Sequence, residues 1–179
     1  MASGERVNQR PRGVRLWGLR SAIAGAIAAA VFLLDQAVKW WLLLAFDLDQ
    51  RQPVRLTPFL DLVLVWNRGV SYGWFASHST ETRLILIGLS LFAALALWVW
   101  ACSTRRPLVA VALGLVIGGA LGNGLDRVVH GAVADYLLFH LGSWSWYVFN
   151  IADSAIVVGV GLLLYDSWRE GAREPAGRA

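Results

Sequence analysis

The chain has 179 residues, of which 57% are hydrophobic, and its mean hydropathy of +0.54 lies well above the norm for soluble proteins. This composition predicts a membrane protein of one compact domain. The formal charge of +4 does not indicate a nucleic-acid partner, because the arginines cluster at the termini and around Arg105 and Arg106 instead of lining an aromatic face.

Four apolar segments, residues 17–41, 84–102, 107–125 and 151–168, have about the 20 apolar residues that a bilayer crossing requires. The first follows a basic start, as in a removable signal peptide. Its polar far end and the three later segments favour an uncleaved span instead. We therefore expect an all-α membrane protein with four transmembrane helices and one integral domain over residues 1–179, with disordered cytoplasmic tails at 1–15 and 171–179.

The arginines and tryptophans predict how the four spans are oriented. Arginines precede the first span, fill the turn between the second and third, and follow the fourth, so the positive-inside rule places both termini in the cytoplasm. Tryptophans favour the membrane interfaces and agree with this orientation. Trp17, Trp98, Trp100 and Trp168 mark the inner boundary, and Trp40, Trp41, Trp144 and Trp146 mark the outer one.

Two loops are expected on the outer side, a longer one over residues 42–83 and a shorter one over 126–150. The first contains VRLTPFLDLVLVWNRGVSYGWF, which is rich in β-branched and aromatic residues and is interrupted by Asn67, Gly69 and Gly73. This pattern predicts a small extracytoplasmic platform of strands and turns.

The third span carries Gly114, Gly118 and Gly122 at four-residue spacing. Such a stripe lets a second helix approach closely, which stabilises helix packing in lipid. We therefore expect these glycines to serve the architecture and not the chemistry.

The polar residues of the spans gather near their outer ends. Asp35 and Lys39 share a helix face and can form an ion pair. Asn123 shares a face with Asp126 and Arg127, and we expect Asp126 to brace that arginine. Asp153 alone could be a helix cap, and Asp35 with Lys39 only a structural pair. Four acids at one depth, Asp35, Asp126, Asp135 and Asp153, favour a functional site.

Two close carboxylates can hydrolyse a peptide without a metal. The ionised one accepts a proton from water, and the protonated one polarises the scissile carbonyl. No serine, cysteine or histidine lies in a recognisable nucleophile motif, and the single cysteine and scattered histidines lack metal-ligand spacing. We therefore expect neither a metal nor a cofactor. A proton-coupled transporter is the main alternative, although the chain lacks the internal repeats and mid-span acids typical of that class, and a non-enzymatic scaffold would leave the acids unexplained.

Five motifs between Asp35 and Asp153, in the order DQAVK, NRGVSYG, GGALGNGLDR, VADY and FNIAD, closely resemble those of the bacterial lipoprotein signal peptidases, or signal peptidase II. The resemblance implies an intramembrane aspartyl endopeptidase that removes the signal peptide of a prolipoprotein just before its diacylglyceryl-modified cysteine. It implies Asp135 and Asp153 as the catalytic pair. It also implies substrate-binding residues Asn67, Gly69, Asn123, Arg127 and Asn150, with Asp35 and Lys39 as supporting members near the lipid headgroup.

The same resemblance implies a multi-pass protein of the bacterial plasma membrane whose active site lies near the outer leaflet. Its partners would be the lipid-modified prolipoprotein and membrane lipids, with no nucleic acid, and we expect it to act as a monomer. One stretch departs from the family pattern, since Val70, Ser71 and Tyr72 stand where two alanines and a phenylalanine are usual. We leave these three residues out of the predicted site and expect them to alter only the fit of the substrate.

Overall fold

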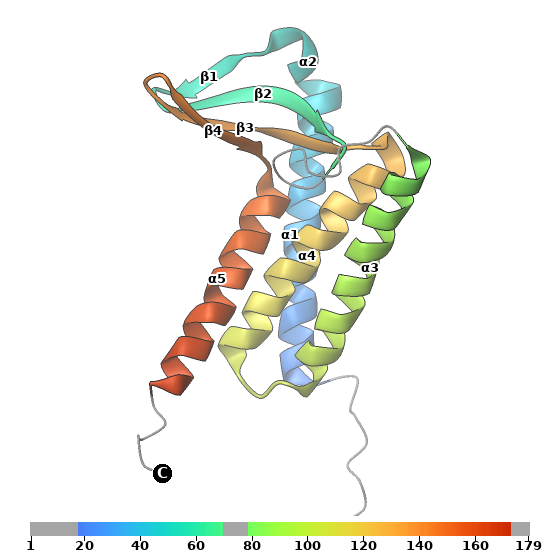
Figure 1. Cartoon of the computed structure of the whole chain (residues 1–179), viewed down its shortest axis with the longest axis vertical. Coiled ribbons are helices and arrows are strands. Elements are labelled where there is room, and N and C mark those ends of the chain that lie inside the picture. The colour runs from blue at the N-terminus through green and yellow to red at the C-terminus, as the bar shows by residue number, and fades with distance from the viewer. Residues whose placement is uncertain (1–17, 70–78, 173–179) are drawn as a thin grey trace, which may run out of the picture.

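A computed structural model describes residues 18–69 and 79–172 of the chain. The described part is a bundle of four long helices with an antiparallel sheet across one end (Figure 1). Each of the four is long and apolar enough to cross a membrane, as the sequence predicted. They are α1 (Leu19–Trp40), α3 (Thr80–Ser103), α4 (Pro107–His130) and α5 (Ile151–Gly171).

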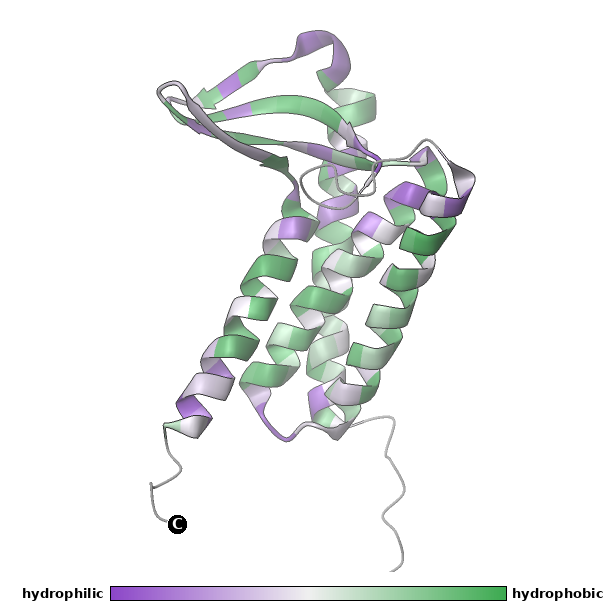
Figure 2. Cartoon of the chain, in the orientation of Figure 1, coloured by the Kyte–Doolittle hydropathy of each residue, from purple (hydrophilic) through white to green (hydrophobic). Residues whose placement is uncertain are grey.

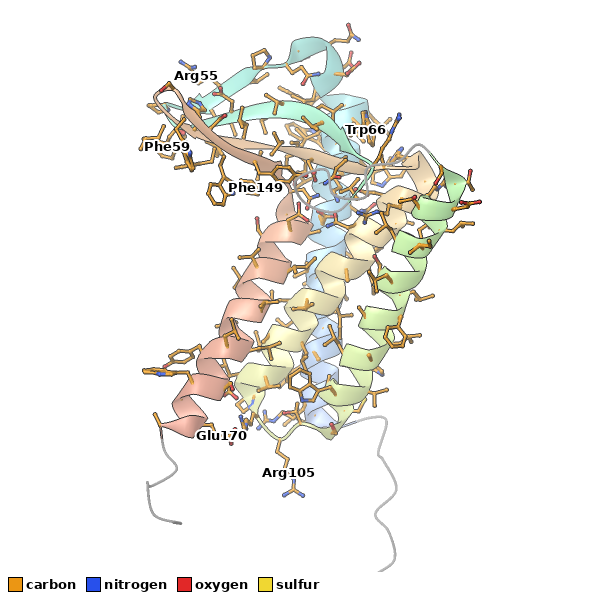
Figure 3. The ribbon with its side chains drawn as sticks, in the orientation of Figure 1. Arg55, Phe59, Trp66, Arg105, Phe149 and Glu170 are labelled. Atoms are coloured by element: carbon orange, nitrogen blue, oxygen red, sulfur yellow. The ribbon has the colours of Figure 1, made fainter. Side chains whose placement is uncertain are left out.

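The first and last described helices begin and end at the same end of the bundle, opposite the sheet (Figure 1). Hydrophobic residues cover the middle of the bundle and polar residues gather at its two ends (Figure 2). Arg105 and Glu170 lie at the end opposite the sheet, whereas Trp66 lies on the sheet (Figure 3). Trp17, most of the two predicted tails and the Val70-Ser71-Tyr72 stretch lie outside the described residues.

Two helices differ from their predicted ends. After α1 the chain continues through a π-helical turn, η1 (Trp41–Ala45), and a short helix, α2 (Leu48–Arg51). Helix α4 runs beyond residue 125 to His130, because Asp126 and Arg127 find polar partners inside the protein and need not mark the water boundary. It ends at Gly131, whose φ of 77° is left-handed and suits glycine.

Helix α4 lies at the centre of the bundle and contacts α1, α3 and α5. Its glycine stripe makes this possible. A Cβ at Gly114 or Gly118 would lie 2.6 Å from the backbone oxygen of Ala24 or Ala28 on α1, which is closer than any real contact. The expected packing role is therefore confirmed for these two glycines, and Gly119 approaches Ala152 on α5 in the same way.

The sheet has the order β1 (Val54–Thr57), β2 (Leu60–Asn67), β3 (Val133–Leu141) and β4 (Trp144–Phe149), and all neighbouring strands are antiparallel. Strands β1 and β2 confirm the predicted platform as far as Asn67. Strands β3 and β4 lie where we expected only a loop. Their pairing with β2 joins segments about 70 residues apart, and this contact supplies the order that local sequence does not show. Beneath the sheet, Leu42, Leu48, Leu62 and Tyr136 form a buried cluster.

Candidate active site

Asp135 is the third residue of β3, where it lies opposite Val65 of β2 and is 1% exposed. Its two carboxylate oxygens have different partners. Oδ1 accepts a hydrogen bond of 2.7 Å from Nδ2 of Asn150, and Oδ2 accepts one of 3.1 Å from Nδ2 of Asn67. The central strands therefore hold this carboxyl group in one orientation at the junction of sheet and bundle.

Asp153 lies in the first turn of α5, at the sheet end of the bundle. Its Oδ1 accepts a hydrogen bond of 2.7 Å from Nδ2 of Asn123, and its Oδ2 accepts one of 3.3 Å from the backbone N–H of Asn150. The side chain of Asn150 in turn accepts from the backbone N–H of Asp153 at 2.9 Å. This reciprocal capping box confirms that Asp153 takes part in capping, while one of its oxygens is also bonded to α4.

Asn150 connects the two aspartates. It is fully buried and forms the single-residue link between β4 and α5. Its side-chain N–H groups donate to Asp135 at 2.7 Å and to Oδ1 of Asn123 at 3.1 Å, while its backbone N–H donates to Asp153. A residue bonded to both carboxyl groups fixes the position of one relative to the other.

A buried network of charges from α1 supports these residues. Nζ of Lys39 lies 2.8 Å from Asp35, 2.7 Å from Asp126 and 3.2 Å from Oδ1 of Asn123. Asp35 accepts the backbone N–H of Ala152 in the first turn of α5, and Asp126 accepts that of Ala134 at the start of β3. The network therefore holds the two backbone segments that carry Asp153 and Asp135.

The predicted ion pair of Asp35 and Lys39 is confirmed, but the expectation that Asp126 braces Arg127 is wrong. The carboxylate of Asp126 bonds to Lys39, to the Gln36 side chain at 3.0 Å and to a backbone N–H of β3. Neighbouring residues on a helix point in different directions, and Asp126 points toward α1. Asp35 and Lys39 are 0% and 2% exposed, which leaves no surface for direct contact with a substrate, contrary to the predicted binding set.

Arg127 reaches from α4 to the chain that follows β2. Its guanidinium donates to the backbone oxygen of Gly69 at 2.8 Å and to that of Asn123 at 3.2 Å, while its Nε has no hydrogen-bond partner among the described residues. The Gly69 N–H donates to the side chain of Asn67 at 3.1 Å. All the predicted site residues therefore lie around the same junction of α1, α4, α5 and the sheet.

Tyr147 on β4 was absent from the predicted site. Its hydroxyl oxygen accepts a hydrogen bond of 2.8 Å from Nδ2 of Asn67, the same nitrogen that donates to Asp135. Both hydrogens of that amide nitrogen are thus used, one toward each partner. Sequence gave no signal for this contact, because it depends on strands that only tertiary pairing defines.

Burial raises the pKa of Asp135 to about 7, and the negative charge of Asp153 raises it further. The hydrogen bonds from Asn67 and Asn150 oppose this shift without cancelling it. Asp135 therefore remains partly protonated near neutral pH. A neutral acid beside a second carboxylate is the arrangement that two-carboxylate hydrolysis requires.

Two cavities open beside Asp153. One, of about 360 Å³, lies between α3, α4 and α5, with Asn67, Asn123 and Arg127 among its polar lining and apolar residues such as Leu89 and Val157 along the helices. The other, of about 420 Å³, lies between β4 and α5 and includes Tyr147 and Phe149. An apolar chain can therefore approach this carboxylate from either side of α5. Within the described residues, no group of three histidine, cysteine or acidic side chains could hold a metal ion.

Comparison with known proteins identifies the family. Residues 27–169 match the family described as Signal peptidase (SPase) II, Peptidase_A8. The lipoprotein signal peptidase of Methylobacterium sp. (strain 4-46) is 51% identical over 162 residues, which cover 89% of this chain and 98% of the relative. That of Nitrobacter hamburgensis is 49% identical, with 90% and 98% covered.

Solved structures agree with this result. A bacterial membrane enzyme determined by the in meso method at 2.3 Å resolution superposes with a TM-score of 0.75 at 23% identity, with 88% of this chain and 94% of that chain covered. A second, at 1.9 Å resolution, gives a TM-score of 0.69 at 26% identity, with 81% and 92% covered. With a family model that matches most of the chain and relatives near 50% identity, the chain belongs to the signal peptidase II family of aspartic endopeptidases.

Proposed function

We propose that Asp135 and Asp153 are the catalytic pair with which this lipoprotein signal peptidase removes the signal peptide from a prolipoprotein. The observation that carries the assignment is Asn150, whose side chain bonds to one aspartate and whose backbone bonds to the other. The raised pKa of Asp135 supports a division of roles between the two carboxyl groups.

In this proposal Asp153 is ionised and Asp135 is protonated when the substrate binds. Asp153 takes a proton from a water molecule as its oxygen attacks the scissile carbonyl carbon, and Asp135 donates its proton to the carbonyl oxygen. The resulting tetrahedral diol then breaks its C–N bond. The leaving nitrogen takes the proton held by Asp153, the new carboxyl group forms as Asp135 takes back its own, and the pair returns to its starting state.

The other polar residues have separate parts in this proposal. Asn67 and Asn150 orient Asp135, while Asn123 orients Asp153. Arg127 lines the cavity between α3, α4 and α5 and is placed to bind backbone oxygens of the substrate. A group at a further remove, Asp35, Lys39 and Asp126, positions the backbone that carries the pair.

We further propose that both termini are cytoplasmic and that the sheet lies on the outer face of the plasma membrane, which puts the site near the outer leaflet. The arginine clusters and the tryptophans at the two ends support this orientation. Reporter fusions after residues 104 and 175 should report the cytoplasm, and fusions near residues 55 and 140 should report the outside. An outside signal after residue 104 would reject the orientation.

The substrate in this proposal is a precursor whose cysteine carries a diacylglyceryl group. Each buried CH₂ of the acyl chains contributes about 0.8 kcal/mol of membrane anchoring, which would hold the scissile bond at the depth of the pair. The test is to incubate the purified enzyme with lipidated and unlipidated precursor at matched concentration and to follow the shortened product by mass. The lipidated form should be cut much faster, and equal rates would contradict the proposal.

A further inference from the structure

The largest of the cavities described here lies away from both aspartates. It measures about 750 Å³ and is formed by residues 25–32 of α1, 87–98 of α3 and 117–128 of α4. None of the described residues that line it is charged, and the Ser90 hydroxyl already donates to the backbone oxygen of Leu86 at 2.9 Å. All three walls belong to candidate membrane spans, so an occupant of this cavity must be apolar.

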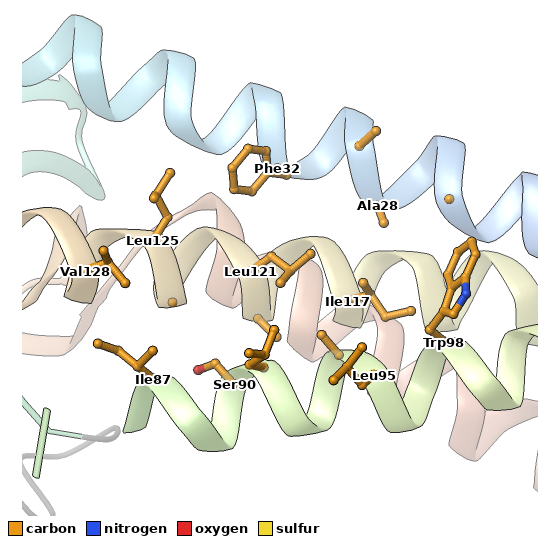
Figure 4. A pocket seen from close by; sticks show the side chains of 16 residues that line it. Ala28, Phe32, Ile87, Ser90, Leu95, Trp98, Ile117, Leu121, Leu125 and Val128 are labelled. Atoms are coloured by element: carbon orange, nitrogen blue, oxygen red, sulfur yellow. The ribbon is translucent and has the colours of Figure 1, made fainter. Parts of the chain in front are cut away.

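The cavity is closed at one end and open toward the sheet side of the membrane. Trp98 lies at the closed end, where its ring packs against α1 so tightly that a Cβ at Gly25 would be 3.3 Å away. Ile87 and Val128 lie at the opposite end (Figure 4). The stretch of α3 between Ile87 and Trp98 is about 16 Å long at 1.5 Å per residue. This is close to half of a hydrocarbon core of about 30 Å, the depth of one leaflet.

A positive charge lies at the open end. Arg83 is one turn of α3 beyond Ile87, and its Nη2 donates to the backbone oxygen of Val128 at 2.7 Å. Its Nε is buried and has no hydrogen-bond partner among the described residues. Arginine binds phosphate oxygens through several N–H groups at once, and here the unused donor lies at the level where a lipid headgroup would be.

We propose that this cavity binds one acyl chain of an anionic phospholipid from the sheet-side leaflet, with the lipid phosphate beside Arg83. The site is distinct from the active site because the contact between α3 and α4 separates them. At that contact a Cβ on Gly124 would lie 3.4 Å from Ser90. Ser90 and Ala120 line both this cavity and the one beside Asp153, so the two cavities share a thin wall. The inference is independent of the catalytic proposal.

The test for the acyl chain uses a matched pair of adjacent alanines. Ala29 and Ala30 are both exposed on α1, but only Ala29 lines the cavity. The protein is placed in phosphatidylcholine vesicles that contain a little phosphatidylglycerol with a photoreactive diazirine in mid-chain, and labelled peptides are mapped by mass. We expect label on residues 87–98 and 117–128, with a several-fold loss in Ala29→Phe and no change in Ala30→Phe.

Label that spreads evenly over other lipid-facing residues such as Val157 and Leu164, or that is equal in the two variants, would overturn the proposal. Crosslinks between two copies of the chain at this face would also overturn it, because they would give the cavity a protein occupant. The processing assay on the same samples shows independently whether the enzyme is folded and active.

The headgroup part of the proposal has its own arm. Wild-type protein should be labelled several-fold more by the photoreactive phosphatidylglycerol than by photoreactive phosphatidylcholine. Arg83→Gln should abolish that preference, whereas Arg83→Lys, which keeps the charge, should retain most of it. Equal labelling of the wild type by the two lipids would overturn the role of Arg83.

Discussion

The ammonium of Lys39 lies 2.7 Å from the carboxylate of Asp126, and each of these side chains is only 2% exposed. The same ammonium is 2.8 Å from Asp35, so one buried cation is shared by two buried anions. Removing one partner of such a group leaves uncompensated charge inside the protein, which costs far more than the net stability of the intact group.

Lys39→Met should therefore destabilise the protein strongly, by about 3–5 kcal/mol, because it leaves Asp35 and Asp126 without their cation. Arg55→Met is the control. Arg55 is 72% exposed and its ion pair with Asp61 should contribute about 0–1 kcal/mol. Thermal unfolding in detergent measures both, and similar losses of Tm in the two variants would contradict the structural role of Lys39.

Asp135→Asn and Asp153→Asn should each lower turnover by about 10²–10⁴-fold, because an amide neither accepts the proton of water nor donates one as an acid. Lipidated substrate should still bind with similar affinity, since asparagine keeps the volume of the side chain. The double variant should be scarcely slower than either single one, as expected for groups that act as a unit. Mass detection of the processed product checks this, and near-wild-type cleavage by a folded single variant would refute the aspartyl pair.

The rate of cleavage should fall as the pH rises through about 7, because Asp135 then loses the proton that it must donate. A fall at low pH should follow when the partner carboxylate is protonated. Since the two groups are coupled, each limb of the kcat profile belongs to the pair. A rate that stays level from pH 6 to pH 9 would contradict the role given to Asp135.

The raised pKa of Asp135 also predicts a pH dependence of stability. Between about pH 4 and pH 7 the folded protein keeps a proton on this group that the unfolded chain has lost, so the free energy of unfolding should fall across this interval and level off above it. Asp135→Asn cannot titrate and should lack this fall. The difference in Tm between variant and wild type should therefore grow in favour of the variant from pH 4 to pH 7, and a constant difference would count against it.

Tyr147→Phe should lower kcat several-fold, in line with about 1 kcal/mol for a lost hydrogen bond, while KM stays nearly unchanged. The variant loses the acceptor that holds the Asn67 amide against Asp135. Tyr165→Phe, at the other end of α5, is the control and should have no effect on cleavage. An unaltered kcat in Tyr147→Phe, or a change in KM alone, would show that this hydroxyl does not position the pair.

The spans were predictable from sequence because hydropathy over about 20 residues is a strong local signal, and the ion pair of Asp35 and Lys39 because helix geometry places them together. The likeness in motifs named Asp135 and Asp153. Strands β3 and β4 were missed, because their order depends on pairing with a distant β2. The true partner of Asp126 was missed for the same reason, since Lys39 lies on another helix. Local pattern carried no information about either contact.

The hydrogen bond from the Ala152 N–H to Asp35 joins the last long helix of the chain to the first. Ribosomes deliver these two segments to the membrane at different times, since more than a hundred residues separate them, and chains fold in the order in which they emerge. Until α5 has inserted, Asp153 has no fixed place and Asn150 no carboxylate to hold. A nascent or truncated chain is thus hydrolytically inert, and proteolytic competence arises only at the final step of biogenesis.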